Sequence, residues 1–262
     1  MDRMIPAWPF ALALLIGMLV CLEIGRKLGI RWLTKDPKGT TSGLGVAEGA
    51  MFTLYGLLLA FTFSEANSRF DVRRELVAEE ANAIGTAYLR LDLLPAKSQP
   101  AMREQFREYL DLRLEAYRKL PDIVAARAAL SMAEKLQREI WAQAIVSSAS
   151  PGGHPEAGKL LLPALNTMFD ITTTRTMAAR IHPALVIYAL LFLLALLCSV
   201  LTGFEMADNK KRNWLYTVAF AVVTAASVFV ILNIEYPRMG LIRIASYDDV
   251  LIEVRQSMQT PQ

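Results

Sequence analysis

The stretch GAMFTLYGLLLAFTFS, residues 49–64, is followed without a break by EANSRFDVRRELVAEEANAI, residues 65–84. The first part carries no charge and is rich in leucine and phenylalanine, which is typical of a helix in lipid. In the second part apolar residues recur at three- and four-residue steps, the period of a helix with one buried face. No proline separates the two parts. The pattern therefore predicts one helix that leaves the membrane after Ser64 and continues to about Leu94.

Three further runs of the chain are also long, apolar and free of charge. They cover residues 4–22, 181–204 and 213–234. A membrane helix needs about 20 apolar residues, and open strands would leave backbone groups unpaired in lipid. The sequence therefore predicts an all-α membrane protein with four transmembrane helices and a helical soluble domain inserted between the second and the third.

The expected domain organisation follows the distribution of charge along the chain. Residues 1–64 hold two membrane helices (about 4–24 and 43–64) and a basic loop, residues 65–181 form the helical soluble domain, residues 182–235 hold the last two membrane helices, and residues 236–262 pack on the soluble domain. Within the soluble domain we expect helices at about 99–120, 122–146 and 158–180, because prolines and a Ser-Pro-Gly-Gly loop interrupt the periodic pattern. A kink at Pro183 is expected where the chain enters the third membrane helix.

The composition of the 262 residues excludes several classes of protein. Charged residues make up 20% of the chain, whereas a soluble domain carries about a quarter. The net charge of +3 is too small for a nucleic-acid-binding protein, so we expect no nucleic acid among the partners. No nucleophile elbow, phosphate-binding loop or zinc-protease motif is present, and the two cysteines have no metal-ligand spacing. We therefore expect no enzyme, no cofactor and no metal.

The basic residues leave the orientation in the membrane open. By the positive-inside rule, a basic loop marks the cytoplasmic side. Basic residues lie both in the short connections between membrane helices and at the opposite helix ends. The short connections hold Arg26, Lys27, Arg31, Lys35, Lys38, Lys210, Lys211 and Arg212. An even number of spans places both termini on the same side as the soluble domain.

The second membrane helix carries two stripes at helical spacing. Small residues form one stripe, which allows helices to approach closely in lipid. Its members are Gly45, Gly49, Gly56 and Ala60. Bulky residues form the other stripe, with Phe52, Tyr55, Leu59 and Phe63 as its members. The bulky stripe fits either ordinary helix packing or the constriction of a pore that closes by excluding water.

A group of polar residues follows the second membrane helix and lies close to its apolar stripe. Buried charges must pair, and three charges after the fourth membrane helix are suitable partners. The group comprises Arg69, Arg73, Arg74, Glu80, Asn82, Glu235, Arg238 and Arg243. Two interpretations remain open for this group, a salt-bridge network between subunits or between helices, or a charged vestibule beside a pore.

Several of these residues occur in motifs that resemble the bestrophin-like domain family of bacterial membrane proteins. The motifs are LLLAFTFS at 57–64, followed by Ala66, Arg69-Phe70 and Arg73-Arg74, then EANAIGTAYLRLDLLP at 80–95 and the tail PRMGLIRI at 237–244. The resemblance spans nearly the whole chain. One departure is Asn233-Ile-Glu235, where the family tends to carry an Asp-Leu-Asp type sequence.

The resemblance implies a distant relation to bestrophins, which are pentameric anion channels with four spans per subunit. In bestrophins the second span lines the pore and carries an apolar neck, and the helical domain lies in the cytoplasm. We therefore expect a multi-pass protein of the plasma (bacterial inner) membrane that assembles as a cyclic homo-oligomer, a pentamer by resemblance. Its ions would be chloride or other small anions. The alternative is a non-conducting membrane scaffold or sensor whose helical domain binds a partner.

Overall fold

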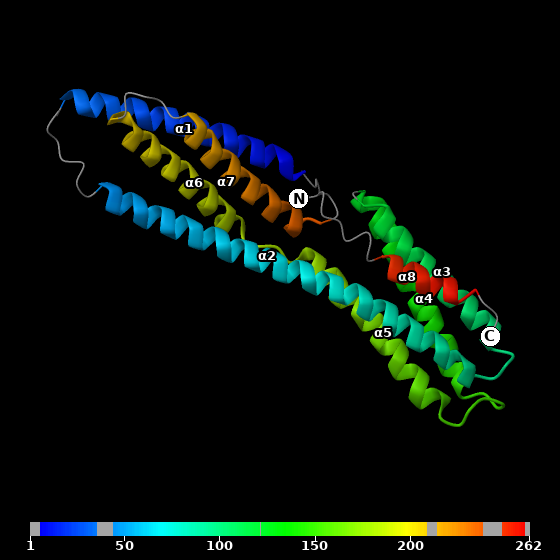
Figure 1. Ribbon diagram of the computed structural model, residues 1–262. Coiled ribbons are helices and arrows are strands. Elements are labelled where there is room, and N and C mark those ends of the chain that lie inside the picture. The colour runs from blue at the N-terminus through cyan, green and yellow to red at the C-terminus, as the bar shows by residue number, and fades with distance from the viewer. Residues whose placement is uncertain (1–5, 36–43, 121, 209–213, 238–247, 260–262) are drawn as a thin grey trace. The chain divides into compact units, whose positions relative to one another are not determined.

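The computed structural model describes residues 6–35, 44–120, 122–208, 214–237 and 248–259 (Figure 1). Every regular element within these ranges is a helix, as the sequence predicts. The helices are α1 (Ala7–Lys35), α2 (Leu44–Leu89), η1 (Arg90–Leu93), α3 (Gln99–Arg118), α4 (Ile123–Ser148), α5 (Ala157–Arg180), α6 (Leu185–Glu205), η2 (Met206–Asp208), α7 (Trp214–Glu235) and α8 (Asp249–Ser257). They belong to two compact units. The apolar unit contains Ile5–Ser68 and His182–Leu241, and the polar unit contains Arg69–Ile181 and Ile242–Gln262.

The apolar unit holds the segments that can cross a membrane. Four helical segments of the described chain are long and apolar enough to do so, which confirms the expected number. Within the unit, α1 packs on α6 and α7 around a core of aliphatic side chains. The most buried of these include Leu14, Met18, Leu191 and Val228. This burial stabilises the bundle through close packing of side chains.

Three glycines bring the backbones of α1 and α6 together. A Cβ atom at Gly25 would lie 2.0 Å from the carbonyl oxygen of Val200, and one at Gly203 would lie 2.1 Å from that of Leu22. Gly29, one helical turn after Gly25, faces Phe204 in the same way. Only a residue without a side chain fits such an approach. Gly25 and Gly29 therefore form a G-x-x-x-G contact that the sequence pattern had not singled out.

Helix α1 continues well beyond the apolar run from which it was predicted. It ends at Lys35, so Arg26, Lys27, Arg31 and Lys35 lie on the helix and not in a loop. The close packing of Gly25 and Gly29 on α6 stabilises these last turns. The remaining basic residues expected in the short connections, Lys38, Lys210, Lys211 and Arg212, lie outside the described residues.

Helix α2 runs without a break from Leu44 to Leu89, and η1 extends it to Leu93. This confirms the prediction of one helix through Ser64, and the physical reason is the absence of any proline along it. By contrast, α5 and α6 are separate helices. Residues 181–184 between them are not helical, because Pro183 has no N–H to donate. The expected kink at Pro183 is thus a complete interruption.

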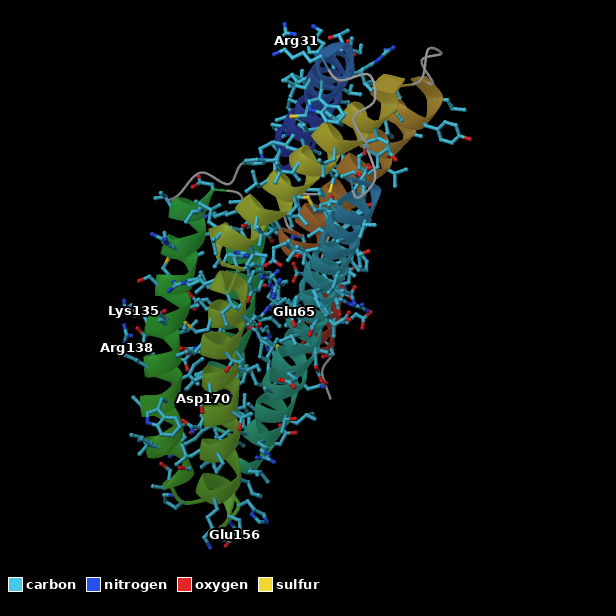
Figure 2. The ribbon with its side chains drawn as sticks, turned by 90° about the vertical axis from the view of Figure 1, so that its left-hand side faces the viewer. Arg31, Glu65, Lys135, Arg138, Glu156 and Asp170 are labelled. Atoms are coloured by element: carbon cyan, nitrogen blue, oxygen red, sulfur yellow. The ribbon has the colours of Figure 1, made fainter. Side chains whose placement is uncertain are left out.

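The polar unit is a bundle of α3, α4, α5, α8 and the second half of α2. Its core is built around the fully buried side chains of Ile84, Phe106, Tyr109, Ile140 and Leu165. The N-terminus of α4 is capped by the carboxylate of Asp122, which accepts a hydrogen bond from the N–H of Ala125 at 3.0 Å. The C-terminal helix α8 packs on this core through Leu251 and Met258. In Figure 2, α5 lies between α4 and α2.

The glycine contact in the apolar unit predicts a position-specific effect on stability. Gly203→Ala places a methyl group against the backbone of Leu22, so we expect it to lower the free energy of unfolding by about 1–3 kcal/mol. Gly85→Ala is the matched control, because it makes the same change within a helix at a position where a Cβ meets no atom within 4 Å. The control should be neutral or stabilising, since alanine is the better helix former. Thermal unfolding in detergent measures both, and equal melting temperatures would contradict the contact.

Candidate functional site

A carboxylate at the centre of the polar unit is completely removed from water. Glu80 of α2 has an exposed fraction of 0%, and two nearly buried arginines neutralise it. The Nε atom of Arg113 on α3 donates to Glu80 Oε1 at 2.6 Å. The Nη1 atom of Arg175 on α5 donates to Glu80 Oε2. Three helices are thereby joined through one ionised side chain.

Two further residues complete this buried charge cluster. The hydroxyl of Tyr117 donates to Glu80 Oε2 at 3.3 Å and accepts a hydrogen bond from Arg113. The guanidinium carbon of Arg175 lies 3.9 Å from the centre of the Tyr117 ring, within the range of a cation–π contact. The Nη2 atom of Arg175 donates to Asp248 at 3.0 Å, so the cluster also holds the start of α8. Two carboxylates thus balance two guanidinium groups.

The charges of the cluster stay ionised because they stabilise one another. Burial by itself would raise the pKa of Glu80, but the guanidinium groups of Arg113 and Arg175 outweigh this and lower it. For Arg175, burial would lower the pKa, and the nearby Tyr117 and Glu80 raise it instead. A fully satisfied and enclosed cluster presents no reactive group to a substrate. Its physical effect is to fix α2, α3, α5 and α8 relative to one another.

The sequence pattern had identified Glu80 but not its partners. Glu80 pairs with Arg113 and Arg175, and neither belongs to the charged group expected around it. A signal was present, because Arg113 falls one helical turn after Tyr109 and Leu110 on the apolar face of α3. A charged residue inside an apolar stripe has to find a partner.

Arg73 binds the end of α5 through backbone carbonyl oxygens. Its Nε and Nη2 atoms donate to the carbonyl oxygens of Ala178 and Ile181, at 3.2 and 2.9 Å. These carbonyls lie at the C-terminal end of α5, where cations are favoured by the helix dipole. Arg73 is nearly buried, with an exposed fraction of 8%. It therefore caps the end of α5 and is turned away from solvent.

The other members of the expected charged group are dispersed. Arg74 pairs with Asp71 at 3.2 Å on the surface, Arg69 is half-buried, and Asn82 is exposed. In the apolar unit, Glu235 is fully buried and contacts His182 Nδ1 at 2.9 Å. The remaining two, Arg238 and Arg243, lie outside the described residues.

The bulky stripe of α2 faces the interior of the apolar unit. Tyr55 has an exposed fraction of only 5%. The ring of Phe52 meets that of Phe220 on α7 edge to face, with centroids 5.4 Å apart, and Leu59 packs on the same cluster. Phe63 is the exposed member, at 44%. Three of the four expected pore residues, Phe52, Tyr55 and Leu59, therefore pack against other helices of the same chain.

Another set of bulky side chains on α2 points away from the bundle. Leu54, Leu57 and Phe61 have exposed fractions of 54%, 51% and 61%. They follow one another at three- and four-residue steps and so form a single stripe. Of the four apolar helical segments, that of α2 is the least covered, with 11% of its residues buried. The described chain thus leaves a bulky apolar face of α2 open.

The small residues of α2 also lie on the open side. Gly45, Gly49, Gly56 and Ala60 are exposed, and a Cβ at each of the three glycines would meet no atom within 4 Å. Within the described part of the chain, these glycines therefore have no packing partner. Among the described residues, no three His, Cys, Asp or Glu side chains gather as a metal site would require.

Comparisons with known proteins give one family and one fold. A family model described as the bestrophin-like domain matches residues 31–246. Two single-residue variants of a bacterial bestrophin homologue from Klebsiella pneumoniae have similar structures. The first has a TM-score of 0.67 and 13% sequence identity, and the second has 0.68 and 11%. Both matches cover 95% of this chain and 100% of that chain. No curated protein matches the chain by sequence.

Removal of the buried carboxylate should strongly destabilise the polar unit. Glu80→Ala leaves Arg113 buried without its anion and Arg175 with Asp248 alone, which costs about 3–5 kcal/mol of unfolding free energy. Glu75→Ala is the matched control, because Glu75 is an exposed glutamate on the same helix. Chemical unfolding of purified protein in detergent measures the difference. A Glu80→Ala variant as stable as the control would show that the cluster contributes little.

The lowered pKa of Glu80 also predicts a dependence of stability on pH. In the unfolded chain Glu80 takes up a proton near its ordinary value of 4.5, whereas the folded protein resists protonation to lower pH. The unfolded state therefore binds more protons as pH falls, and the contribution of Glu80 disappears as pH falls from about 4.5 through the folded pKa. Melting temperatures of the parent and of Glu80→Gln should converge over that range. A constant difference would contradict the ionised state of Glu80.

Proposed function

The chain belongs to the bestrophin-like domain family, and from this premise we propose that it is a homo-oligomeric ion channel in which α2 lines the pore. The observation that carries the proposal is the open face of α2. This helix is the least covered of the apolar segments, and its exposed stripe includes Leu57 and Phe61. Copies arranged around an axis would cover part of this face and leave the rest to line a narrow opening.

The proposed membrane topology places the polar unit outside the lipid. Residues 65–181 would form a soluble domain between the second and third membrane helices, and residues 236–262 would pack on it. The buried charge cluster supports this, because ionised groups are costly in hydrocarbon. The proposed location is the plasma membrane, which is the inner membrane of a bacterium, with the soluble domain in the cytoplasm as the family resemblance implies.

The proposed assembly is a cyclic ring of identical subunits, with five copies by the resemblance to bestrophins. A conducting pore requires closed rotational symmetry around α2. The open glycines of α2 support close contact between copies, since nothing in the described chain occupies the space beside them. A scaffold or sensor, the second candidate, would need no such closure.

The proposed constriction is formed by the exposed bulky residues of α2. Leu57, Phe61 and Phe63 are candidates because they lie open, whereas Phe52, Tyr55 and Leu59 pack within the subunit. Apolar rings around a narrow opening exclude water, and ions then face a desolvation barrier.

The proposed ion is chloride or another small anion, as the resemblance implies. Positive charge beside the opening would raise the local anion concentration. Arg69 would contribute to it, and Arg74 less so, because Asp71 pairs with it at 3.2 Å. Arg73 contributes less, since it is nearly buried at the end of α5.

Shortening one exposed ring should raise the ion flux. Phe61→Ala widens the proposed constriction, and a barrier lowered by about 1.4 kcal/mol raises the flux about tenfold. Phe52→Ala is the matched control, because it removes the same side chain from the inner face of α2. Proteoliposomes with a halide-sensitive dye report anion flux, and a parallel set of vesicles with a cation-sensitive dye reports cation flux. If parent and variants are silent for both ions, the scaffold interpretation replaces the channel.

A further inference from the structure

The last turns of α1 extend beyond the length that lipid tails can cover. The helix has 29 residues, which is about 44 Å at 1.5 Å per residue, whereas the hydrocarbon of a bilayer is about 30 Å thick. The glycine contact with α6 indicates where the boundary lies. Gly29 faces Phe204, and the next residue, Glu205, ends the apolar run of α6. The residues of α1 after Gly29 therefore lie at the level of the lipid headgroups, and Lys27 lies at the boundary.

Three cations at this end lie on the side of α1 that is turned away from the bundle. Lys27, Arg31 and Lys35 recur every four residues and are exposed. Lys27 and Arg31 each follow a buried glycine by two residues, which is about 200° around the helix. Because Gly25 and Gly29 pack on α6, the rotation of α1 is fixed and these cations point out of the bundle. Figure 2 shows Arg31 near the end of α1.

The cations at the end of α1 have no anionic partner in the described chain. Glu23 precedes Lys27 by one helical turn, but neither it nor any other described carboxylate pairs with the three cations. Glu48, which also lies at this end of the unit, accepts a hydrogen bond from Thr202 at 3.2 Å instead. The Nε atom of the neighbouring Arg26 is buried and meets no hydrogen-bond acceptor among the described residues.

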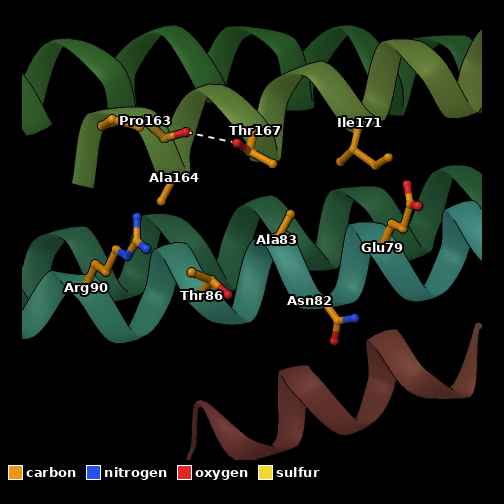
Figure 3. A pocket seen from close by; sticks show the side chains of 9 residues that line it. All are labelled: Glu79, Asn82, Ala83, Thr86, Arg90, Pro163, Ala164, Thr167 and Ile171. Atoms are coloured by element: carbon orange, nitrogen blue, oxygen red, sulfur yellow. Dashed lines mark hydrogen bonds between the residues drawn. The ribbon is translucent and has the colours of Figure 1, made fainter. Parts of the chain in front are cut away.

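Two exposed cations of the polar unit show the alternative, an acceptor that the chain itself supplies. Arg90 lies at the edge of a groove between α2 and α5 (Figure 3) and donates to the carbonyl oxygen of Leu160. Lys159 pairs with Glu156 at 3.0 Å. For the cations of α1, an acceptor would have to come from outside the described chain.

An exposed apolar row runs beside the cations of α1. Ile24, Leu28 and Trp32 have exposed fractions of 46%, 47% and 37%. Leu28 and Trp32 each follow a cation directly, so the two rows lie about 100° apart. Tryptophan favours the level of the headgroups, and the ring of Trp32 lies 6.0 Å from that of Phe204. A molecule with a negative headgroup and apolar chains would match both rows.

We propose that the end of α1 binds an anionic phospholipid, whose phosphate lies against Lys27 and Arg31 and whose acyl chains lie along Ile24 and Leu28. Basic residues beside a membrane helix attract anionic lipids, and their long side chains reach the headgroups while the stems cover apolar surface. A lipid is the fitting partner because this side of α1 faces away from the bundle at the depth of the headgroups. The inference rests on the membrane location of the apolar unit and does not require the chain to conduct ions.

Titration of the full-length protein with phosphatidylglycerol in a neutral detergent tests this site. We expect phosphatidylglycerol to raise the melting temperature of the parent more than phosphatidylcholine, which has no net charge. The variant with Lys27→Gln and Arg31→Gln should need about tenfold more phosphatidylglycerol for the same rise, because it removes two attractive charges. The matched control, Lys97→Gln with Arg138→Gln, removes the same two residue types from exposed sites of the polar unit. It should respond like the parent.

Two further arms separate charge from side-chain shape and lipid from free phosphate. Lys27→Arg with Arg31→Lys keeps both charges and should retain the response of the parent. Glycerol phosphate, which has the headgroup chemistry without acyl chains, should not raise the melting temperature. A rise with glycerol phosphate equal to that with phosphatidylglycerol would overturn the assignment to a lipid.

The other outcomes are equally decisive. Equal rises with the two lipids, or an unchanged response of Lys27→Gln with Arg31→Gln, would overturn the site. The same loss of response in the control variant would show a dependence on net charge alone and would also overturn it. Because the titration measures no ion flux, each of these outcomes leaves the proposed channel to be tested by the dye assay.

Discussion

The polar unit depends on the neutralisation of one buried charge, the carboxylate of Glu80, which is completely removed from water. An unpaired charge in this position would cost a large part of the folding free energy of a typical domain. The chain meets the constraint with Arg113 and Arg175, which come from two other helices. Asp248 then balances the second guanidinium and brings the start of α8 to the same point. Helices that are distant in sequence are thereby held in one arrangement.

Helix α2, which carries Glu80, also runs through the apolar unit. Its buried and exposed faces differ in character between the two units. In the polar unit, the inner face of α2 packs on a mixed core and its outer face is polar. In the apolar unit, Tyr55 faces the bundle while Leu57 and Phe61 lie open. Glycine packing between α1 and α6 places those two backbones in contact, whereas α2 has no comparable contact along its glycines in the described chain. The uncovered side of α2 is the feature on which the proposed assembly and the proposed pore are based.

The role of a charged residue near α2 depends on whether its side chain is buried, which the sequence pattern does not show. A group of arginines after a membrane helix suggests a basic vestibule, but side chains act on ions only where they reach water. Arg73 caps α5, and Arg175 neutralises Glu80. The charges that remain exposed, such as Glu79 on α2 and Lys135 on α4, are the ones that reach water.

The sequence by itself determined the class of the fold. Apolar runs of sufficient length predicted the four membrane segments, and uninterrupted periodicity without proline predicted the passage of α2 through Ser64, because both depend only on local composition. The family was also readable from local motifs such as residues 80–95. Only the tertiary structure decided which face of α2 is open, because Tyr55 and Phe61 are equally bulky and differ only in what packs beside them. It likewise decided that Glu80 pairs with Arg113 and Arg175 and that Gly25 and Gly203 form the close contact, since pairing across helices depends on rotation and depth, which helical spacing alone does not fix.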